Sequence, residues 1–404
     1  MHIVLGTPSW PREKSSSGIV TYVDNLRLDL IAKGHQVSII VLGGSDEDLG
    51  PDVIWPTRTL GFKVQAKLMR LLGKPGWAHE NWGVMIAAAL NELHKRRPID
   101  VFEVEESFGW CGKIKQHISF PMVVKLHGPT FLVSPLNDHS DNAHKQRIAH
   151  EGMALRMQDC ITSPSKCTLD DTLRYYALHP KYSAHIVNSL AEHKNIPLWT
   201  ASSHDKNQLL FVGRFDRIKG ADIVLKAFAL LVQTKPQLRL IFVGPDSGLV
   251  DDNGVKWSAL DYAKHLFSPA DLQKISFLGK QPPSAIEKLR AQSALVIIAS
   301  RWENQSYTTL EAMLQECPVV ASASGGTAEL ISDGHSGRLF QNKNPESLAN
   351  AILEVLQSPE QAAILGTNAR GYVQEKHAPS LVAEATLIAY ANAIQLHASK
   401  SATK

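Results

Sequence analysis

Two basic side chains in one short loop have the spacing of a phosphate-binding site. An apolar strand candidate at 209–212 runs into the loop Gly213–Gly220, which carries Arg214 and Lys219. An arginine offers a planar fork that matches phosphate oxygens, and a lysine offers a compact point charge. A helical pattern begins after this loop, and backbone N–H groups at a helix start favour an anion. The pattern indicates a diphosphate site, and two solvated loop charges remain the alternative.

Two carboxylates, Glu303 and Glu311, lie around the start of another predicted helix. An apolar strand candidate spans 294–299, and helical periodicity begins near Ser306. Glu303 therefore precedes the helix and Glu311 lies about two turns into it, so neither is an ordinary first-turn cap. The helix start again favours an anion above the strand end. Taken alone, the pair is equally compatible with a solvated loop glutamate and a glutamate on a helix face.

The first half of the chain opens with the same order of strand, polar loop and helix. A strand candidate at 2–6 is followed by the loop 7–18, and a helix is predicted from about Gly18 to Lys33. Ser17 and Gly18 at the helix start would let a ligand approach backbone N–H groups closely. The spacing is not the G-x-G-x-x-G fingerprint of dinucleotide-binding proteins, which disfavours a nicotinamide cofactor.

These loops are positioned by two series of alternating strand and helix patterns. Strand candidates of the first series lie at 2–6, 36–42, 100–104, 121–126, 159–162 and 185–187, and those of the second at 209–212, 238–243, 275–277, 295–298, 318–321 and 337–340. The alternation predicts an α/β protein of two Rossmann-like, doubly wound parallel sheets in tandem. The predicted domains are 1–200 and 207–378, and a last helix at 380–397 is expected to cross back to the first domain.

Length and composition agree with a two-domain globular protein. The 404 residues exceed one ordinary core, and the content is 44% hydrophobic and 20% charged. The 4 cysteines form no C-x-x-C pair, which favours a reducing, cytoplasmic compartment. Neither a signal peptide nor an apolar run of membrane-spanning length is expected from the sequence.

The charge distribution raises the question of membrane contact. A net charge of +3 gives no general argument for nucleic-acid binding. Eight basic residues lie between Arg58 and Arg97 against two acidic ones, and within 63–74 leucines and valine share one helical face while lysines and arginine line another. Such a helix can rest on an anionic membrane surface, at the inner face of a cell membrane, but short basic amphipathic helices are also common on soluble domains.

Several motifs together resemble one enzyme family. They are Gly213–Gly220, the Glu303–Glu311 pair with its Glu-Ala-Met, Pro318-Val-Val-Ala-Ser322 and Gly325-Gly-Thr-Ala-Glu329. In this order they are similar to the retaining GT-B nucleotide-sugar glycosyltransferases of family 4, also called glycosyl transferases group 1. The first half fits more loosely, through the Gly18 loop, Asp100–Glu105 and Val124–Gly128. The resemblance implies an enzyme whose donor occupies the second domain and whose acceptor enters from the first.

The resemblance also implies roles for single residues of the second half. Glu303 would meet hydroxyls of the donor sugar, and Glu311 would hold the ribose hydroxyls. Arg214 and Lys219, next to Gly213, would bind the diphosphate. Backbone N–H groups of one further segment would assist them; its members are Gln305, Ser306, Tyr307 and Thr308.

In the first half the resemblance implies donor and acceptor contacts. His127 would lie near the donor sugar, between donor and acceptor, with a packing histidine as the alternative. Glu103 and Glu105 would lie on the acceptor side, and Gly18 beside the donor. The family often has two adjacent glycines where this chain has Ser17 and Gly18, so this loop departs from the family pattern.

A second departure from the family pattern lies at 304–307. Many members place a short Phe-Gly step after the first glutamate, whereas this chain has Asn-Gln-Ser-Tyr there. The resemblance places these side chains beside the donor sugar, where they therefore differ from those of many members. The polar stretch 128–146 is interpreted as a mobile loop on the acceptor side.

Metal use is weighed separately. Asp46-Glu-Asp48 has the spacing of the metal-binding triplet of a different glycosyltransferase fold, and His139, His144 and His150 lie in a polar stretch. None has zinc-motif spacing with a second ligand pair, so both sets are interpreted as solvated loops. We expect no metal ion and no cofactor besides the nucleotide-sugar co-substrate.

The resulting hypothesis is a retaining hexosyltransferase. The family's habits favour a UDP-sugar such as UDP-glucose, added to a hydroxyl of an oligosaccharide or lipid-linked acceptor in a growing surface polysaccharide of the cell envelope. A nucleotide-sugar epimerase of similar fold and a non-catalytic sugar-nucleotide-binding homologue are the alternatives. The spacing of Glu303 and Glu311 speaks against the epimerase.

Overall fold

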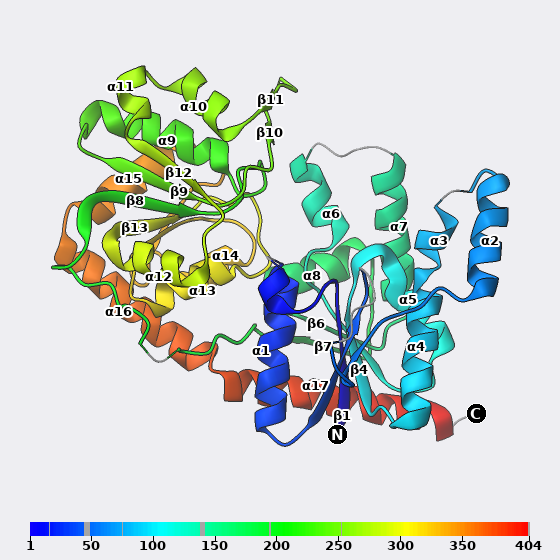
Figure 1. Ribbon diagram of the computed structural model, residues 1–404. Coiled ribbons are helices and arrows are strands. Elements are labelled where there is room, and N and C mark those ends of the chain that lie inside the picture. Colours follow the sequence, from blue (N-terminus) through cyan, green and yellow to red (C-terminus); the bar gives the residue numbers. More distant parts are fainter. Residues whose placement is uncertain are drawn as a thin grey trace. The chain divides into compact units, whose positions relative to one another are not determined.

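The computed structural model describes residues 1–15, 17–43, 49–74, 76–137, 142–193, 195–251 and 253–402. The chain divides into two compact units, each with a parallel sheet covered by helices (Figure 1). Unit 1 joins Met1–Ser134 and Ser140–Ser189 with Pro379–Lys404, and unit 2 is built mainly from Leu190–Ala378. The expectation of two Rossmann-like parallel-sheet halves is confirmed.

Unit 1 contains a seven-stranded sheet in the order β3-β2-β1-β4-β5-β6-β7, parallel throughout. Its strands are β1 (His2–Thr7), β2 (Gln36–Val41), β3 (Val53–Ile54), β4 (Val101–Glu105), β5 (Met122–Lys125), β6 (Cys160–Ser163) and β7 (Tyr182–His185). β1 and β4 are buried along their whole length, because helices cover both faces of a parallel sheet and its strands are then nearly continuous apolar runs.

The helices of unit 1 follow its strands in the usual crossover pattern. They are α1 (Gly18–Ala32), α2 (Leu60–Leu71), α3 (Trp77–Glu80), α4 (Trp82–Arg96), α5 (Trp110–His117), α6 (Thr130–Val133), α7 (Asn142–Arg156), α8 (Lys166–Tyr175) and α17 (Pro379–Ala402). The chain also has short 3-10 turns at Arg12–Lys14, Ser107–Gly109 and Ser134–Asn137. No helix in the described part of the chain has the length and apolarity to cross a lipid bilayer.

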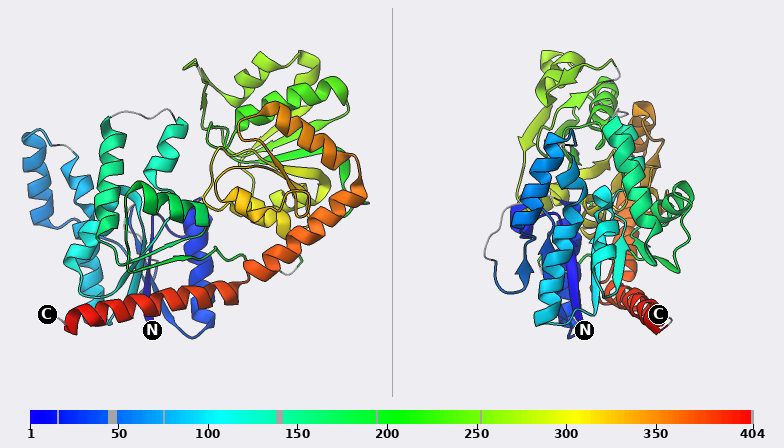
Figure 2. Two further views of the ribbon diagram at one scale, coloured as in Figure 1. Left: turned by 180° about the vertical axis from the view of Figure 1, so that it is seen from behind. Right: turned by 90° about the vertical axis from the view of Figure 1, so that its right-hand side faces the viewer.

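The C-terminal helix α17 completes unit 1. It packs against α1 and against β4 to β7, and Figure 2 shows it, in red, running along the part of unit 1 that contains these strands. The Tyr390 hydroxyl donates to Glu103 Oε2 at 3.1 Å in the interior, and the Tyr22 hydroxyl of α1 donates to Glu103 Oε1 at 2.7 Å. This one carboxylate therefore joins the last helix of the chain to the first.

Unit 2 contains a six-stranded parallel sheet in the order β12-β9-β8-β13-β14-β15. Its strands are β8 (Asp205–Val212), β9 (Arg239–Val243), β12 (Ile275–Gly279), β13 (Ser293–Ile298), β14 (Val319–Ser322) and β15 (Arg338–Phe340); β10 (Leu249–Val250) and β11 (Lys256–Trp257) form a separate antiparallel pair. The helices are α9 (Ala221–Thr234), α10 (Ala259–Leu266), α11 (Pro269–Leu272), α12 (Pro283–Gln292), α13 (Tyr307–Leu314), α14 (Thr327–Leu330), α15 (Pro345–Leu356) and α16 (Pro359–Lys376).

The strand order of unit 2 reverses between β8 and β13. Leu210 pairs with Val296 and Phe211 with Ile297, so these two central strands end side by side. In open α/β sheets, ligands bind beyond the carboxyl ends of the strands at such a reversal. The loops that follow β8 and β13 are the two loops that carry the predicted phosphate and carboxylate residues.

The structure divides the chain slightly earlier than the predicted boundary at 200–207. Leu190 N–H donates to the His377 carbonyl at 3.0 Å, and the indole N–H of Trp199 donates to the Ser293 carbonyl at 2.8 Å. Trp199 is buried in the core of unit 2. Residues 190–200 belong to unit 2 because this indole is one of its core side chains.

The prediction of a loop over 128–146 is wrong for its described residues. α6 and a 3-10 turn occupy 130–137, and α7 begins at Asn142. Thr130 N–H and Oγ1 both donate to the buried Glu151 carboxylate of α7, at 2.8 and 2.5 Å, which joins the two helices. The polar composition of 128–146 gave no sign of these helices, because the contact that stabilises them involves Glu151, which lies beyond the stretch.

Candidate active site

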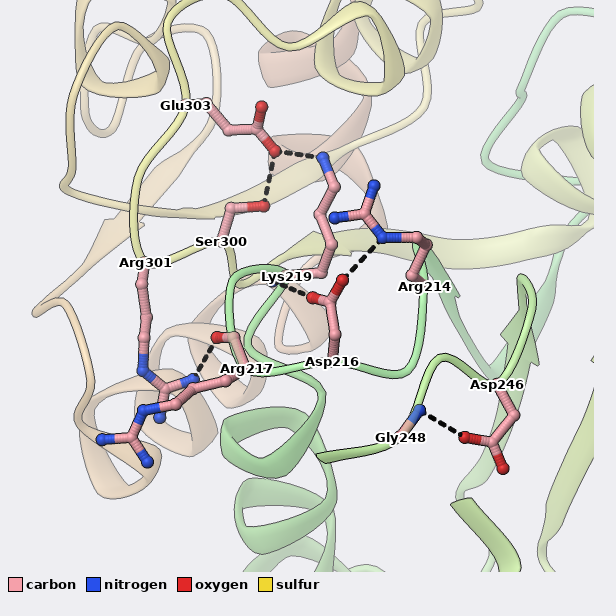
Figure 3. A network of polar contacts seen from close by, with 9 residues as sticks. All are labelled: Arg214, Asp216, Arg217, Lys219, Asp246, Gly248, Ser300, Arg301 and Glu303. Atoms are coloured by element: carbon pink, nitrogen blue, oxygen red, sulfur yellow. Dashed lines mark hydrogen bonds and ion pairs between the residues drawn. The ribbon is translucent and has the colours of Figure 1, made fainter. Parts of the chain in front are cut away.

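The loop after β8 is organised by the carboxylate of Asp216. Its Oδ1 accepts the Lys219 N–H at 2.7 Å, and its Oδ2 accepts Nε–H of Arg214 at 2.6 Å. Figure 3 shows the terminal nitrogens of Arg214 extending away from Asp216. Within the described residues Asp216 is the only acceptor of a hydrogen bond from Arg214, and the side chain is 47% exposed. The fork of the guanidinium therefore remains open to an external anion.

Gly220 brings this loop against the end of β13. It lies in the left-handed region with φ +70°, and a Cβ there would stand 2.0 Å from the Ala299 carbonyl oxygen. Only glycine fits a backbone this close at that φ. The close approach carries Lys219, the preceding residue, to the residues that follow β13.

Lys219 and Glu303 meet at this point. Lys219 Nζ forms an ion pair with Glu303 Oε1, and the Ser300 hydroxyl donates to the same oxygen at 2.8 Å (Figure 3). Both charged side chains are largely but not completely buried. The second carboxylate oxygen of Glu303 accepts no hydrogen bond from the described residues. A cation suited to phosphate and a carboxylate suited to hydroxyls therefore lie side by side.

The backbone of Glu303 is fixed by the loop after β14. Gly326 N–H donates to the Glu303 carbonyl at 2.8 Å, and Gly325, with φ +52°, has room for no Cβ because one would stand 2.4 Å from that carbonyl oxygen. The glycine pair in the motif Gly325–Glu329 is thus required by the close contact of two loops.

The neighbouring Arg301 ties the same loop to α9. Its guanidinium makes a bidentate ion pair with Asp222, at 2.7 and 2.8 Å, and donates to the Arg217 carbonyl as well. Arg301 and Asp222 are almost entirely buried. Bidentate pairing fixes orientation as well as distance. This pair holds the loop that carries Arg214 and Lys219 in register with the loop that carries Glu303.

The second glutamate, Glu311, lies on α13. Ser306 caps this helix by accepting the Thr309 N–H at 3.3 Å, so the helix begins where the sequence predicts. Glu311 Oε2 is bound by Arg290 of α12, and the Glu311 side chain is 35% exposed. The predicted donor contacts Gln305, Ser306, Tyr307 and Thr308 form the loop and first turn between the two glutamates.

In unit 1, His127 follows β5. Its ring packs against Tyr22 with ring centroids 5.0 Å apart. Removal of water from the ring lowers the His127 pKa to about 3, with a smaller contribution from the nearby Lys125 ammonium. The ring is therefore neutral at physiological pH. The His127 and Gly128 N–H groups both donate to Glu106, at 2.9 and 2.7 Å, so a buried carboxyl shapes the loop that presents the histidine.

The other predicted residues of unit 1 lie in different surroundings. Both oxygens of Glu103 accept tyrosine hydroxyls in the interior, which is a packing role. Glu105 is buried beside Ser107, and burial raises its pKa to about 7. The structure does not show either carboxylate exposed to an acceptor. Gly18 is the first residue of α1, and a Cβ there would meet nothing within 4 Å, so no close packing requires a glycine at this position.

Four residues of the site were missed by sequence reasoning. Asp216 and Ser300 are within or beside the quoted motifs and could have been found as partners of Arg214 and Glu303. Asp222 and Arg290 carried no signal, because each acts through a side chain that only the fold brings near.

No group of three metal-ligating side chains occurs in the described ranges of the chain. His144 and His150 lie on α7. Asp46, Asp48 and His139 fall outside the described residues.

Comparison with known families identifies the class of protein. The protein-family model described as "Glycosyl transferases group 1" matches residues 197–372, and the one described as "Glycosyltransferase Family 4" matches residues 16–188. The two matches cover both halves in the expected order. The chain therefore belongs to the family 4 glycosyltransferases, as the motifs predicted.

Individual relatives are similar over part of their length. Spore coat protein SA of Bacillus subtilis is 30% identical over 46% of this chain and 49% of its own length. The D-inositol 3-phosphate glycosyltransferase of Segniliparus rotundus is 26% identical over 64% of this chain and 58% of its own. The matches thus span about half the length of these curated relatives.

Solved structures show the fold over the whole chain. The sucrose-phosphate synthase of Thermosynechococcus elongatus has a TM-score of 0.75 at 20% identity and covers 98% of this chain and 99% of its own. Anabaena Alr3699/HepE, in complex with UDP and glucose, has a TM-score of 0.71 at 18% identity and covers 97% of this chain and 100% of its own. The fold is GT-B, as predicted.

Proposed function

We propose that this protein is a retaining hexosyltransferase that uses a UDP-sugar, with UDP-glucose as the first candidate. The contact between Lys219 and Glu303 carries the proposal. Lys219 and the open fork of Arg214 supply two positive charges for a diphosphate. Glu303 supplies a carboxylate oxygen for the hydroxyls of the attached sugar. A diphosphate at Lys219 would compete with Glu303 for the ammonium and leave this carboxylate to the sugar.

The proposed reaction needs no protein nucleophile. The bond between the sugar C1 and the diphosphate oxygen breaks, and the electron pair leaves with UDP. The acceptor hydroxyl oxygen forms the new bond to C1 on the face that UDP vacates, which retains configuration, and its proton passes to a phosphate oxygen. Arg214, Lys219 and the N-terminus of α13 stabilise the leaving charge, so catalysis rests on electrostatics and positioning.

The donor and acceptor are assigned from several indications. UDP is favoured because the similar HepE structure holds UDP and glucose. Membership of family 4 supports the transferase class, and the family's habits favour a lipid-linked acceptor of a surface polysaccharide. In unit 1 the neutral ring of His127 is assigned to hydrogen bonding with sugar hydroxyls rather than to proton transfer, since its pKa is about 3.

The test is a panel of UDP-, GDP- and ADP-hexoses, incubated with and without oligosaccharide and lipid-linked acceptors. Sugar transfer from a UDP-hexose that requires an acceptor, with the product anomer determined by NMR, is the expected result. Conversion of the donor without an acceptor would identify an epimerase. Binding without either reaction would identify a non-catalytic homologue. Transfer only from GDP donors would refute the choice of UDP.

Peripheral membrane contact is the second part of the proposal, and it rests on α2. Phe62 is the buried residue of this helix, and it packs on Trp77 and Trp82 with ring centroids 5.4 and 6.2 Å away. Five large apolar side chains of α2 and its C-cap are more than half exposed; they are Leu60, Val64, Leu68, Leu71 and Leu72. The basic residues interleaved with them are Lys63, Lys67, Arg70 and Lys74. Apolar and cationic groups on one exposed helix match the interface of an anionic bilayer.

Vesicle sedimentation tests this contact. Wild-type protein is expected to bind phosphatidylglycerol vesicles and not phosphatidylcholine vesicles. Lys67→Glu should weaken binding about fivefold or more, because one basic residue near an anionic surface contributes about 1 kcal/mol. Leu68→Ser should weaken it about tenfold or more, from about 1.5 kcal/mol for a buried leucine. Leu381→Ser, at an exposed leucine of α17, is the matched control. Equal binding to both vesicle types would contradict the proposal.

A further inference from the structure

A buried arginine, Arg290, binds Glu311, the second glutamate of the site. Arg290 lies on α12 with its side chain 3% exposed, and its Nη2 donates to Glu311 Oε2. Its Nη1 donates to Gln315 Oε1 at 3.3 Å. The amide of Gln315 in turn donates to the Pro197 and Glu287 carbonyls at 2.8 and 2.9 Å. The guanidinium is thus anchored by an amide that is itself fixed, and its other terminal nitrogen binds Glu311.

The two carboxylate oxygens of Glu311 lie in different surroundings. A buried cation is costly unless it is paired, and Glu311 is the carboxylate that pairs with Arg290 among the described residues. Oε2 faces the arginine. Oε1 accepts no hydrogen bond within the described part of the chain, and about a third of the side chain is exposed. One oxygen is therefore anchored by Arg290, and the other is left without a hydrogen bond from the described residues.

We propose that Arg290 is a positioning residue that fixes the Glu311 carboxylate for recognition of the ribose hydroxyls of the donor nucleotide. This inference rests on the proposed function, in which Glu311 binds the ribose. A carboxylate discriminates between hydroxyl and hydrogen only if its free oxygen is held where the hydroxyl arrives. Without the arginine, rotation of the glutamate side chain would spread that oxygen over several positions. Arg290 would then set selectivity for ribonucleotides without touching the donor.

The experiment compares the binding of UDP with that of 2′,3′-dideoxy-UDP by calorimetry, which requires no knowledge of the sugar or the acceptor. Wild-type protein is expected to prefer UDP about tenfold or more, as the loss of hydrogen bonds to a charged group implies. Arg290→Met should reduce the ratio of the two dissociation constants to within about threefold of one, mainly by weakening UDP. Arg290→Lys keeps the charge but not the fork and should give an intermediate ratio.

A matched control separates positioning from stability. Arg338 of β15 pairs with two carboxylates, Asp333 and Glu354, and lies on an edge strand. Arg338→Met should lower the unfolding temperature and leave the binding ratio unchanged. A wild-type ratio in folded Arg290→Met, or in Arg290→Lys should the methionine variant not fold, would overturn the inference.

The outcome for Glu311 distinguishes this inference from the function on which it rests. Glu311→Ala should abolish the preference for UDP. If Glu311→Ala loses the preference and the Arg290 variants keep it, only the role of Arg290 fails. If Glu311→Ala keeps the preference, the ribose site itself is wrongly assigned. If wild-type protein binds neither UDP nor its dideoxy analogue, the choice of UDP fails.

Discussion

Arg214 offers the sharpest test of the diphosphate site. Its Nε is engaged by Asp216 at 2.6 Å, so two terminal nitrogens remain to bind phosphate oxygens. Each such charge-assisted bond contributes about 1.5 to 3 kcal/mol, and the lower value applies because the side chain is 47% exposed. Arg214→Ala should therefore cost about 3 kcal/mol in the transition state. That loss corresponds to a decrease of about a hundredfold in kcat/KM.

The assay is release of UDP from the UDP-hexose that the donor panel identifies, at saturating acceptor. Arg214→Lys keeps a charge and loses the bidentate geometry, so an intermediate loss of about tenfold is expected. Calorimetry with UDP alone should show the same order of variants. Transfer by Arg214→Ala at the wild-type rate would refute the assignment of this arginine to the diphosphate.

Arg217→Ala provides the matched control from the same loop. Figure 3 shows its side chain on the far side of the loop from Arg214 and Lys219. Its carbonyl, which accepts a hydrogen bond from Arg301, is retained in the variant. The substitution removes one positive charge from the loop and should change kcat/KM by less than about threefold. A hundredfold loss in this variant would mean that net charge, and not the fork of Arg214, determines activity.

Three further predictions concern the backbone of unit 2 and two side chains of unit 1. Gly220→Ala should lower the free energy of unfolding, measured by urea denaturation, by more than Gly254→Ala does. Both glycines have a positive φ, but only a Cβ at Gly220 would lie 2.0 Å from the Ala299 carbonyl oxygen. His127→Asn should lower the transfer rate about tenfold and leave the shape of its pH profile between about pH 5 and pH 8 unchanged, since a ring with a pKa of about 3 does not titrate there. Burial raises the pKa of Glu106 from 4.5 to about 8, so its contribution to stability is complete below pH 4.5 and is lost as the pH rises to about 8. Glu106→Gln should therefore make the unfolding temperature less dependent on pH across that range. An unchanged dependence on pH would contradict the raised pKa of Glu106.

The sequence predicted the parts of the site that lie at strand ends. Arg214, Lys219 and Glu303 follow two apolar runs, and parallel strands present their carboxyl ends at one edge. The structure places the last two in contact. Their roles in donor binding stay predictions. The strand and helix periodicity, together with the resemblance to the family, thus assigned residues 84 positions apart to one site.

Side-chain partners from other elements could not be predicted. Arg290 lies in a helix of ordinary composition, and Asp222 looks like an acidic residue of a helix first turn. Their functions depend on which helix packs beside which loop, and no local pattern carries that information. The tyrosine partners of Glu103 were missed for the same reason, since one of them comes from α17, 287 residues away.

The way in which α17 completes unit 1 has a consequence for synthesis of the chain. Tyr390 and the rest of this helix leave the ribosome after all of unit 2 has been made, yet unit 1 needs them to satisfy Glu103 and cover β4 to β7. Unit 2 is continuous over 190–378 and can complete its own core while α17 is still within the exit tunnel. Unit 2 can therefore complete its fold before unit 1, although unit 1 begins the chain. During that interval the apolar face destined for α17 is a natural target for chaperones.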